Sequence, residues 1–185
     1  ETLARYSTAS TGLIFVEGDP YKIDRIVPGS RADFAGNPLK KGDELVAVNG
    51  VRVDKNVNRE YYFTSSVVPK EVVLRFSRVE NTAAGKSSAG KSSDGKSSAG
   101  SGDIMEFTVK LHTMNTGDLR SLLYTEWEDW NRAKVNELSG GKIAYAHMRD
   151  MSPEALEKFV IEMNTDGVHK EGLILDLRFN NGGNV

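Results

Sequence analysis

Two short stretches of this chain decide its fold: IVPGSRA at residues 26–32 and LKKGDELVAVNG at residues 39–50. In the first, Pro-Gly breaks a β-branched strand, and Ser30 can cap a short helix over residues 31–35. In the second, a Gly-Asp turn leads into an apolar strand. That strand ends in Asn-Gly, the pair most typical of type I′ hairpin turns. The two stretches therefore predict short strands joined by tight turns.

The flanking segments continue this pattern of short strands. Residues 13–16 and 21–27 are apolar or β-branched and flank a Gly-Asp-Pro turn. Residues 56–66 are expected to supply a second short helix. Two longer strands follow at 71–78 and 105–111, and the second alternates strictly between apolar and polar side chains. Because two such strands joined by a turn form a hairpin, we expect these two to pair.

A low-complexity tract, residues 83–102, separates the two strands of this hairpin. A Gly-Lys-Ser-Ser motif recurs in it with a period of five. The tract lacks large apolar side chains and cannot offset the entropy cost of ordering, so we expect a flexible insertion at the hairpin tip. The alternative is a docking tail, in which Lys86, Lys91 and Lys96 form a weak basic patch.

Taken together, PGS-x-A, KKGDEL and VNG resemble the central signature of PDZ domains in bacterial and archaeal proteases. The resemblance implies a PDZ-like β-barrel with two short helices over residues 8–113, interrupted by the insertion at 83–102. A PDZ domain adds a peptide as a strand to an exposed sheet edge and holds its C-terminal carboxylate with backbone N–H groups. The expected peptide-binding residues are Thr11, Gly12, Leu13 and Ile14.

These four residues have a plainer interpretation, a simple turn that leads into a strand. Gly12 permits the turn in either case. Arg52 or Arg59 could assist a bound carboxylate, although nothing in their spacing selects one of them.

The chain changes character after the hairpin. Residues 118–138 carry leucines, two tryptophans and other apolar side chains near helical spacing, and a Gly-Gly pair ends the predicted helix. We expect the tryptophans to be core anchors. A strand at 142–148, a helix that begins at Ser152-Pro153 and an apolar strand at 172–177 follow. The last is typical of a strand covered on both faces, although in this chain we expect it to expose hydrophobic surface. This strand–helix–strand order predicts a parallel strand pair.

The sequence DLRFNNGG at residues 176–183 follows the last of these strands. It resembles the D-x-R-x-N-x-G-G element of the S41 serine peptidases. GKIAYAHMRDM at residues 141–151 is similar to the tricorn branch of that family. The resemblance implies a linker helix over 114–141 and the N-terminal part of an S41 core, related to the ClpP/crotonase fold, over 142–185. The overall class is then α+β, with a partial α/β segment at the end.

In the S41 family this loop contributes to the oxyanion hole. A Gly-Gly turn after a buried strand permits close backbone approach and exposes N–H groups to a developing negative charge. The resemblance carries two donors and three supporting residues onto this chain, namely Gly182 and Gly183, and Asp176, Arg178 and Asn180. Asn181 and Asn184 depart from the small or apolar residues expected there, so the choice of donor stays open. A plain turn is the alternative.

The other catalytic groups of the family are not expected within this chain. The family's nucleophilic serine lies downstream of the Gly-Gly loop, and the tricorn base histidine lies before the PDZ domain. His147 is expected to be a buried, hydrogen-bonded strand histidine, and His112 and His169 to be solvated. We therefore expect a fragment of a serine endopeptidase or oligopeptidase that is inactive by itself. The alternative is a non-catalytic PDZ scaffold that positions neighbouring domains.

Composition narrows the range of partners. The 185 residues carry a net charge of −2 without clustered Lys and Arg, which argues against nucleic acid, and no apolar window could span a bilayer. The chain has no cysteine and no metal-ligand spacing, so we expect neither a metal nor a cofactor. The resemblance implies peptides or unfolded protein C-termini as partners, with the remaining domains of the parent protease, and is compatible with a homo-oligomer. No signal sequence is visible, so the cytoplasm and the periplasm both stay open.

Overall fold

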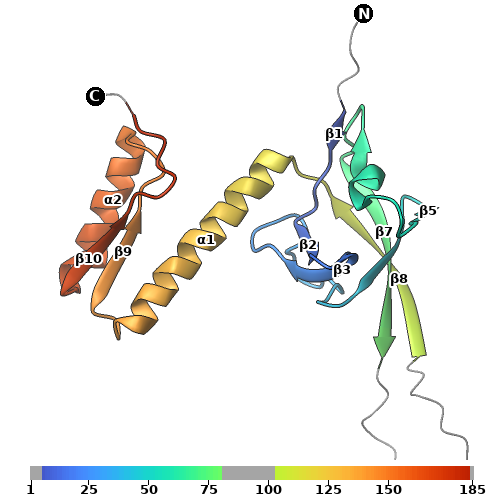
Figure 1. Ribbon diagram of the computed structural model, residues 1–185, viewed down its shortest axis with the longest axis horizontal. Helices are drawn as coiled ribbons and strands as arrows, with labels where there is room; N and C mark the ends of the chain where they lie inside the picture. The colour runs from blue at the N-terminus through green and yellow to red at the C-terminus, as the bar shows by residue number, and fades with distance from the viewer. Residues whose placement is uncertain (1–5, 81–102, 184–185) are drawn as a thin grey trace, which may run out of the picture. The chain divides into compact units, whose positions relative to one another are not determined.

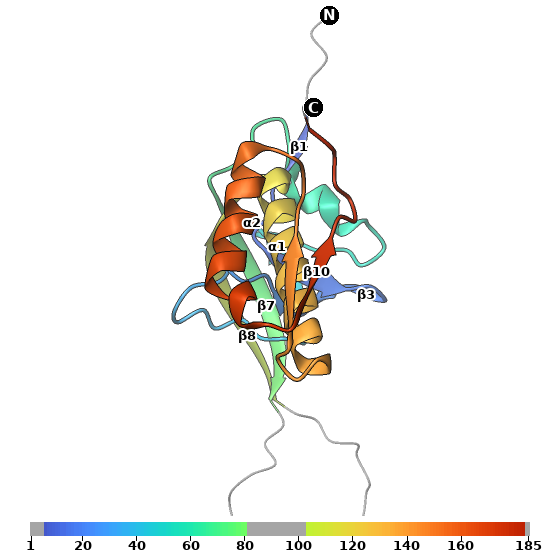
Figure 2. The ribbon, with the colours of Figure 1, turned by 90° about the vertical axis from the view of Figure 1, so that its left-hand side faces the viewer.

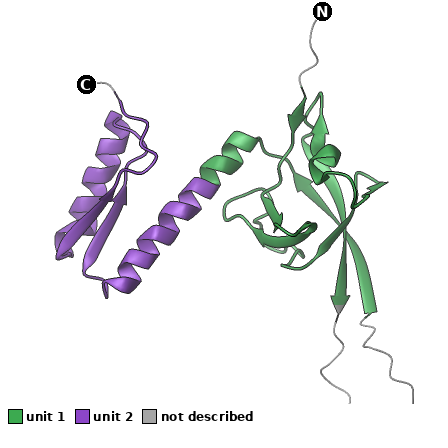
Figure 3. Ribbon diagram, viewed as in Figure 1, with its two compact units in different colours: residues 1–122 green, residues 123–185 purple. Residues whose placement is uncertain are grey.

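The computed structural model describes residues 6–80 and 103–183 and divides the chain into two units (Figure 1). Unit 1 ends at Leu122 and unit 2 begins at Leu123, so the boundary falls inside the long helix α1 (Thr116–Leu138) (Figure 3). The repeat predicted to be a flexible insertion lies outside the described residues. No described helix combines the length and the apolar composition that crossing a membrane requires.

Unit 1 is built from antiparallel strands. Its elements are β1 (Ser7–Thr8), β2 (Leu13–Val16), β3 (Asp19–Ile26), β4 (Glu44–Val48), β5 (Val51–Arg52), the 3-10 helix η1 (Arg59–Phe63), β6 (Thr64–Ser65), β7 (Glu71–Glu80) and β8 (Asp103–His112). The main sheet has the order β2-β3-β4-β7-β8, with β5 paired to β4, and β1 pairs separately with β6.

Two predictions of paired strands are confirmed in this sheet. β7 and β8 pair without interruption from Glu71 opposite His112 to Glu80 opposite Asp103, which is the predicted hairpin. Asn49 and Gly50 join β4 to β5 with φ values of 49° and 82°. Both values are positive, as a type I′ turn requires.

The α+β class is confirmed, but the expected barrel is not closed. β2 and β8 lie at opposite ends of the strand order and do not pair with each other in the described residues. The short helix expected over residues 31–35 is also wrong, because this segment forms turns. The N–H of Ala32 donates to the carbonyl of Thr11, and that of Asp33 to the carbonyl of Ser30. A five-residue segment cannot repay the cost of helix nucleation when its backbone bonds elsewhere.

The second expected helix, over residues 56–66, is shorter than predicted. It is the 3-10 helix η1, which begins after Asn58 and ends at Phe63. The side chain of Asn58 caps it by accepting from the N–H of Glu60. Its last predicted residues belong instead to β6, which pairs with β1. Because β6 uses its backbone groups in a sheet, the helix ends early.

The core of unit 1 lies between the main sheet and the segments that cover it, and includes Tyr21, Ile23, Leu45, Leu74, Phe76 and Leu111. One charged residue is buried beside it. Asp43 is 1% exposed and accepts from the guanidinium of Arg78, with Nε at 2.6 Å and Nη2 at 2.7 Å, and from the Lys40 N–H at 2.7 Å. The Gly-Asp turn of the opening motif therefore anchors β7 through an ion pair.

Unit 2 contains most of α1, followed by β9 (Ile143–His147), α2 (Pro153–Thr165), the 3-10 helix η2 (Gly167–His169) and β10 (Gly172–Asp176). α2 lies along the two strands (Figure 2). β9 and β10 form the predicted parallel pair, with Gly172 opposite Ile143 and Asp176 opposite His147. The predicted cap of α2 is also confirmed, because Ser152 accepts from the Ala155 N–H.

Burial in unit 2 differs from expectation. Trp130 is exposed, so only Trp127, which is half-buried, fits the predicted anchor role. The apolar pattern of β10 is typical of a strand covered on both faces, but Leu173, Ile174 and Leu175 are 41–46% exposed. This exposure agrees with the other expectation for the strand, that it exposes hydrophobic surface in this chain. Side-chain burial depends on which elements cover a strand, and a local apolar pattern does not specify them.

Candidate functional site

The end of β10 carries a buried carboxylate. Asp176 is 7% exposed and accepts from the Tyr145 hydroxyl at 2.7 Å, from the Arg178 N–H at 3.0 Å and from Arg178 Nε at 2.9 Å. The Arg178 guanidinium holds the pKa of the Asp176 carboxyl well below its usual range, and the Tyr145 hydrogen bond acts in the same direction. Burial, together with this hydrogen bond to Asp176, raises the pKa of Tyr145 to about 12. Asp176 is therefore a fixed anion that holds the start of the loop.

The rest of the loop is held by the segment that follows β9. Asn180 Nδ2 donates to the Met148 carbonyl at 2.8 Å. The Asn181 N–H donates to the Arg149 carbonyl at 3.0 Å, and the Gly182 carbonyl accepts from the Met151 N–H at 2.9 Å. These bonds bring the sequence-predicted residues Asp176, Arg178, Asn180 and Gly182 into one turn.

The two glycines of the loop differ in their surroundings. Gly182 has φ +78° and open space around it, and its N–H donates to Asn180 Oδ1 at 2.7 Å. Gly183 lies against the chain: an added Cβ would sit 2.8 Å from Met151 Cβ and 3.0 Å from the Met151 carbonyl. Among residues 6–80 and 103–183, the N–H of Gly183 has no hydrogen-bond acceptor. Close packing thus requires glycine at 183, and a left-handed backbone favours it at 182.

The three histidines are placed as expected. His147 is buried and hydrogen-bonded, with Nδ1 3.0 Å from Oε1 of Glu128 and Nε2 2.8 Å from the Arg178 carbonyl oxygen. His112 and His169 are exposed. Sequence reasoning missed Glu128, which lies on α1 among other acidic residues and is 4% exposed. The available signal was its helical spacing from Tyr124 and Asn131, which places all three on the same face.

A prediction on pH follows from Asp176. Its carboxyl has a lowered pKa in the folded state, so its stabilisation is complete above the unfolded pKa of about 3.9 and is lost as pH falls toward the lowered value. We expect unit 2 to lose stability below about pH 4, and Asp176→Asn to cost about 2 kcal/mol at pH 7 and to flatten this acid dependence. Tryptophan fluorescence during urea unfolding measures the stability of unit 2 at each pH, since both tryptophans lie in unit 2.

The control for this prediction is Asp129→Asn on the exposed side of α1. It removes a carboxylate that is paired only at the surface, with Arg132. We expect its acid dependence to match that of the unsubstituted chain. An Asp176→Asn variant with the same acid dependence as the control would contradict the anchoring role of Asp176.

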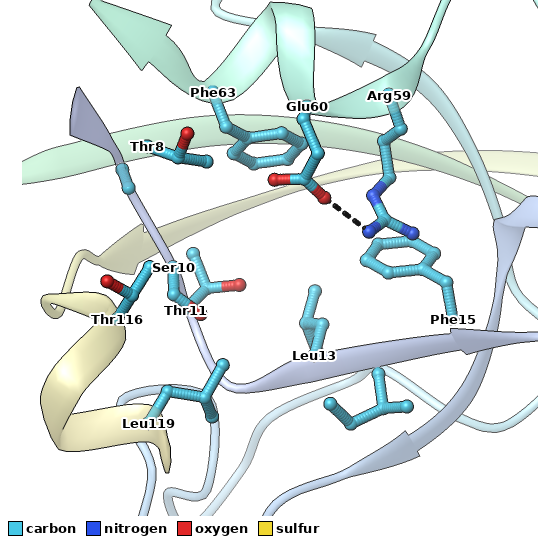
Figure 4. Close-up of a pocket in the computed structure, with 12 residues that line it drawn as sticks. Thr8, Ser10, Thr11, Leu13, Phe15, Arg59, Glu60, Phe63, Thr116 and Leu119 are labelled. Carbon is cyan, nitrogen blue, oxygen red and sulfur yellow. Dashed lines mark hydrogen bonds and ion pairs between the residues drawn. The ribbon is translucent and has the colours of Figure 1, made fainter. Parts of the chain in front are cut away.

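Unit 1 holds a separate site, a pocket of about 250 Å³ between β2 and η1 (Figure 4). Its walls come from four segments: Thr8, Ala9, Ser10 and Thr11 before β2, then Leu13, Ile14 and Phe15 of β2, Arg59, Glu60 and Phe63 of η1, and Thr116 and Leu119 of α1. Three of the four predicted peptide-binding residues, Thr11, Leu13 and Ile14, line this pocket. Gly12 lies between them in the chain but is not part of the lining.

The backbone before β2 is tightly fixed. Gly12 has φ +87°, and a Cβ there would lie 2.1 Å from both Cβ and Oγ of Ser30. The Gly12 carbonyl accepts from the Val27 N–H at 2.9 Å. Gly12 therefore packs directly on Ser30, the serine of the stretch at residues 26–32. Only β3 pairs with β2 among the described strands, so the other edge of β2 is not paired with a strand.

Of the two arginines considered for this site, only Arg59 lines the pocket. Its guanidinium carbon lies 4.2 Å from the centroid of the Phe15 ring, and Nη1 donates to the Pro20 carbonyl at 2.9 Å. Nη2 pairs with Glu60 at 2.5 Å, as the dashed line in Figure 4 shows. Arg52 lies on β5 and is not a lining residue. Arg59 thus places a positive charge at the pocket wall, and its ion pair with Glu60 partly neutralises that charge.

Comparison with known proteins shows which family the end of the chain resembles. Residues 142–185 match the model of peptidase family S41. A tricorn-like protease C-terminal subunit of Sulfurisphaera tokodaii is 39% identical over 175 residues, which cover 90% of this chain and 17% of that protein. Tricorn protease homolog 1 of Streptomyces coelicolor is 28% identical over 190 residues, which cover 98% of this chain and 15% of that protein.

A solved structure shows the same fold. The crystal structure of the tricorn protease superposes with a TM-score of 0.60 and 22% identity, and the match covers 96% of this chain and 15% of that one. The chain thus spans less than one fifth of the length of these relatives.

Proposed function

Because residues 142–185 belong to peptidase family S41 and the chain is tricorn-like, we propose that it is part of a serine peptidase that cleaves proteins or oligopeptides through an acyl-enzyme. In this proposal, residues 8–113 are a PDZ domain that holds peptide C-termini, and residues 114–141 are a linker helix. The segment from residue 142 begins the catalytic core and supplies the oxyanion loop. The partners are peptides or unfolded protein C-termini and the other domains of the peptidase.

The observation that carries this proposal is the loop after β10. An ion pair between the buried Asp176 and the exposed Arg178 holds its start, and hydrogen bonds to the residues after β9 hold its end. A backbone so constrained can present an N–H to a developing oxyanion without reorganising. Gly183 is the better donor of the two glycines, since the N–H of Gly182 is already bonded to Asn180.

The role of unit 1 rests on the pocket beside β2. An edge without a pairing strand can accept a peptide as an added strand, and the pocket at its start is lined by apolar side chains, Leu13, Phe63 and Leu119. Thr11 and Gly12 lie where the peptide would end. The proposed ligand is therefore a chain with a free carboxylate and an apolar last residue.

A peptide titration tests this role. We expect a fluorescent peptide that ends in Leu with a free carboxylate to bind the chain, and its amide to bind at least about tenfold more weakly, because hydrogen bonds to a charged group are lost. Leu119→Glu should abolish binding of the free acid by placing a carboxylate in the pocket wall. Leu138→Glu is the matched control, since Leu138 is exposed at the far end of α1.

Equal binding of acid and amide would contradict carboxylate capture. Absence of binding to either would favour the second candidate, a scaffold domain that only positions its neighbours. One observation supports that candidate: Thr116 and Leu119 of α1 already form one wall of the pocket, so the chain itself limits the room for a peptide.

A further inference from the structure

His147, the last residue of β9, connects a buried acid to the loop. Its side chain is 0% exposed. One ring nitrogen, Nδ1, lies 3.0 Å from Oε1 of Glu128 on α1. The other, Nε2, lies 2.8 Å from the carbonyl oxygen of Arg178, the residue at which the loop begins. The imidazole therefore bridges a helix and the loop without contact with solvent.

The two distances define where the hydrogens must be. A carbonyl oxygen only accepts, so Nε2 carries a hydrogen. Nδ1 faces a carboxyl oxygen, so a hydrogen lies between them as well. Two arrangements satisfy this: an imidazolium beside a carboxylate, or a neutral ring beside a protonated Glu128. Arg149 Nη2, 3.2 Å from Oε2 of Glu128, and Lys158 Nζ at 4.0 Å favour the carboxylate, because both are cations.

The other groups around the ring are consistent with this assignment. Tyr124 on α1 places its hydroxyl 3.1 Å from Nε2, and burial raises the pKa of Tyr124, so that group is neutral. Asp176 on β10 lies opposite His147 in register, but its charge is matched by Arg178. On the remaining elements, the charged groups are Arg149 after β9 and Lys158 on α2, both beside Glu128. Glu128 is thus the acid available to pair with the ring.

We propose that His147 is a positioning residue: held as an imidazolium by Glu128, it donates to the Arg178 carbonyl and so fixes the turn that carries Gly182 and Gly183. The turn needs such a restraint. Phe179, the next residue, has φ +62°, a conformation disfavoured for a bulky side chain, and its ring is exposed. Trp127 packs edge-on against both His147 and Phe179, with centroid distances of 5.2 and 5.9 Å. That His147 holds the turn is argued from these contacts. That the turn serves catalysis rests on the proposed function.

The test uses the chain itself and needs no substrate. In ¹⁵N-detected NMR at pH 7, we expect His147 to show hydrogens on both ring nitrogens, with the shifts of an imidazolium. In Glu128→Gln the anion is gone, and we expect a ring with one hydrogen. Hydrogen exchange at Asn180, Asn181 and Gly182 should then become about tenfold faster, which corresponds to about 1.4 kcal/mol of lost hydrogen bonding. Exchange in the β7–β8 hairpin of unit 1 should not change.

Glu137→Gln is the matched control, since Glu137 is exposed on the same helix and pairs only at the surface with Lys134. It should alter neither the ring nor the loop. A wild-type ring with a single hydrogen would overturn the proposal, and so would a Glu128→Gln loop with unchanged exchange. If Glu128→Gln does not fold, His147→Gln tests whether the ring holds the loop. Its amide keeps one donor for the Arg178 carbonyl, so its loop exchange should stay below that of His147→Phe, and equal rates would overturn the positioning role.

These readouts separate this proposal from the proposed function. A loop that loosens as expected, in a peptidase that proves not to use it, would leave the positioning role intact. A loop that does not loosen would refute the positioning role and leave the S41 match of residues 142–185 unaffected.

Discussion

Asp43→Ala is expected to lower the free energy of unfolding of unit 1 by about 3–5 kcal/mol, the usual cost of removing one partner of a buried ion pair. The carboxylate is 1% exposed, and it holds the Arg78 guanidinium and the Lys40 N–H. Its removal takes away the ion pair of Arg78, which is largely buried, and leaves the Lys40 N–H without its acceptor. Small domains are stable by about 5–15 kcal/mol, so the variant should be close to unfolding.

Urea unfolding followed by the amide signals of β7 and β8 measures this effect, because Arg78 lies on β7. The matched control is Glu106→Ala on β8, which removes a carboxylate that faces Arg75 at 4.0 Å on the exposed side. Exposed pairs contribute about 0–1 kcal/mol, so its midpoint should stay close to that of the unsubstituted chain. A loss of less than 1 kcal/mol in Asp43→Ala would show that the buried pair does not anchor the sheet.

Gly12→Ala should destabilise unit 1 by about 3 kcal/mol, since two costs add. A left-handed backbone costs a residue with a Cβ about 1–2 kcal/mol, and overpacking costs a further 1–3 kcal/mol. The first applies because Gly12 has φ +87°, and the second because its Cβ would lie 2.1 Å from Ser30. The backbone must move to relieve this contact, so the peptide binding proposed for the pocket beside β2 should also weaken.

Two other glycines of unit 1 separate these costs. Gly50 has φ +82° but open space around it, so Gly50→Ala should show the backbone cost alone. Gly18 has neither a positive φ nor a neighbour within 4 Å, so Gly18→Ala should be nearly neutral. Urea midpoints of the three variants give the comparison. Equal destabilisation in Gly12→Ala and Gly50→Ala would contradict the close packing of Gly12 on Ser30.

The parts of the fold that sequence predicted well are those set by local chemistry. The Asn49-Gly50 turn and the Ser152 cap depend on residues adjacent in the chain, and the β7–β8 pairing depends on the strand pattern of each partner. The helix expected after Ser30 failed for the opposite reason. The N–H of Ala32 bonds to the carbonyl of Thr11, 21 residues away in the chain, and local propensity contains no information on such a partner.

The candidate sites show the same division. Motif resemblance singled out Asp176, Arg178 and the two glycines, which the structure brings into one turn. It did not reveal Glu128, because a glutamate on a helix rich in acidic residues looks solvent-exposed until the fold places it against His147. Gly12 and Ser30 were both noted in sequence, but their contact is set by the packing of two separate turns.

The oxyanion role of the loop can be tested with a crystal structure of the longer protein proposed to contain this segment, inactivated by a peptide aldehyde that forms a tetrahedral adduct. We expect an adduct oxygen about 2.7–3.1 Å from the Gly183 nitrogen, with Asp176 and Arg178 still paired beneath the loop. An oxygen held by other donors, more than about 4 Å from the nitrogens of both Gly182 and Gly183, would contradict it.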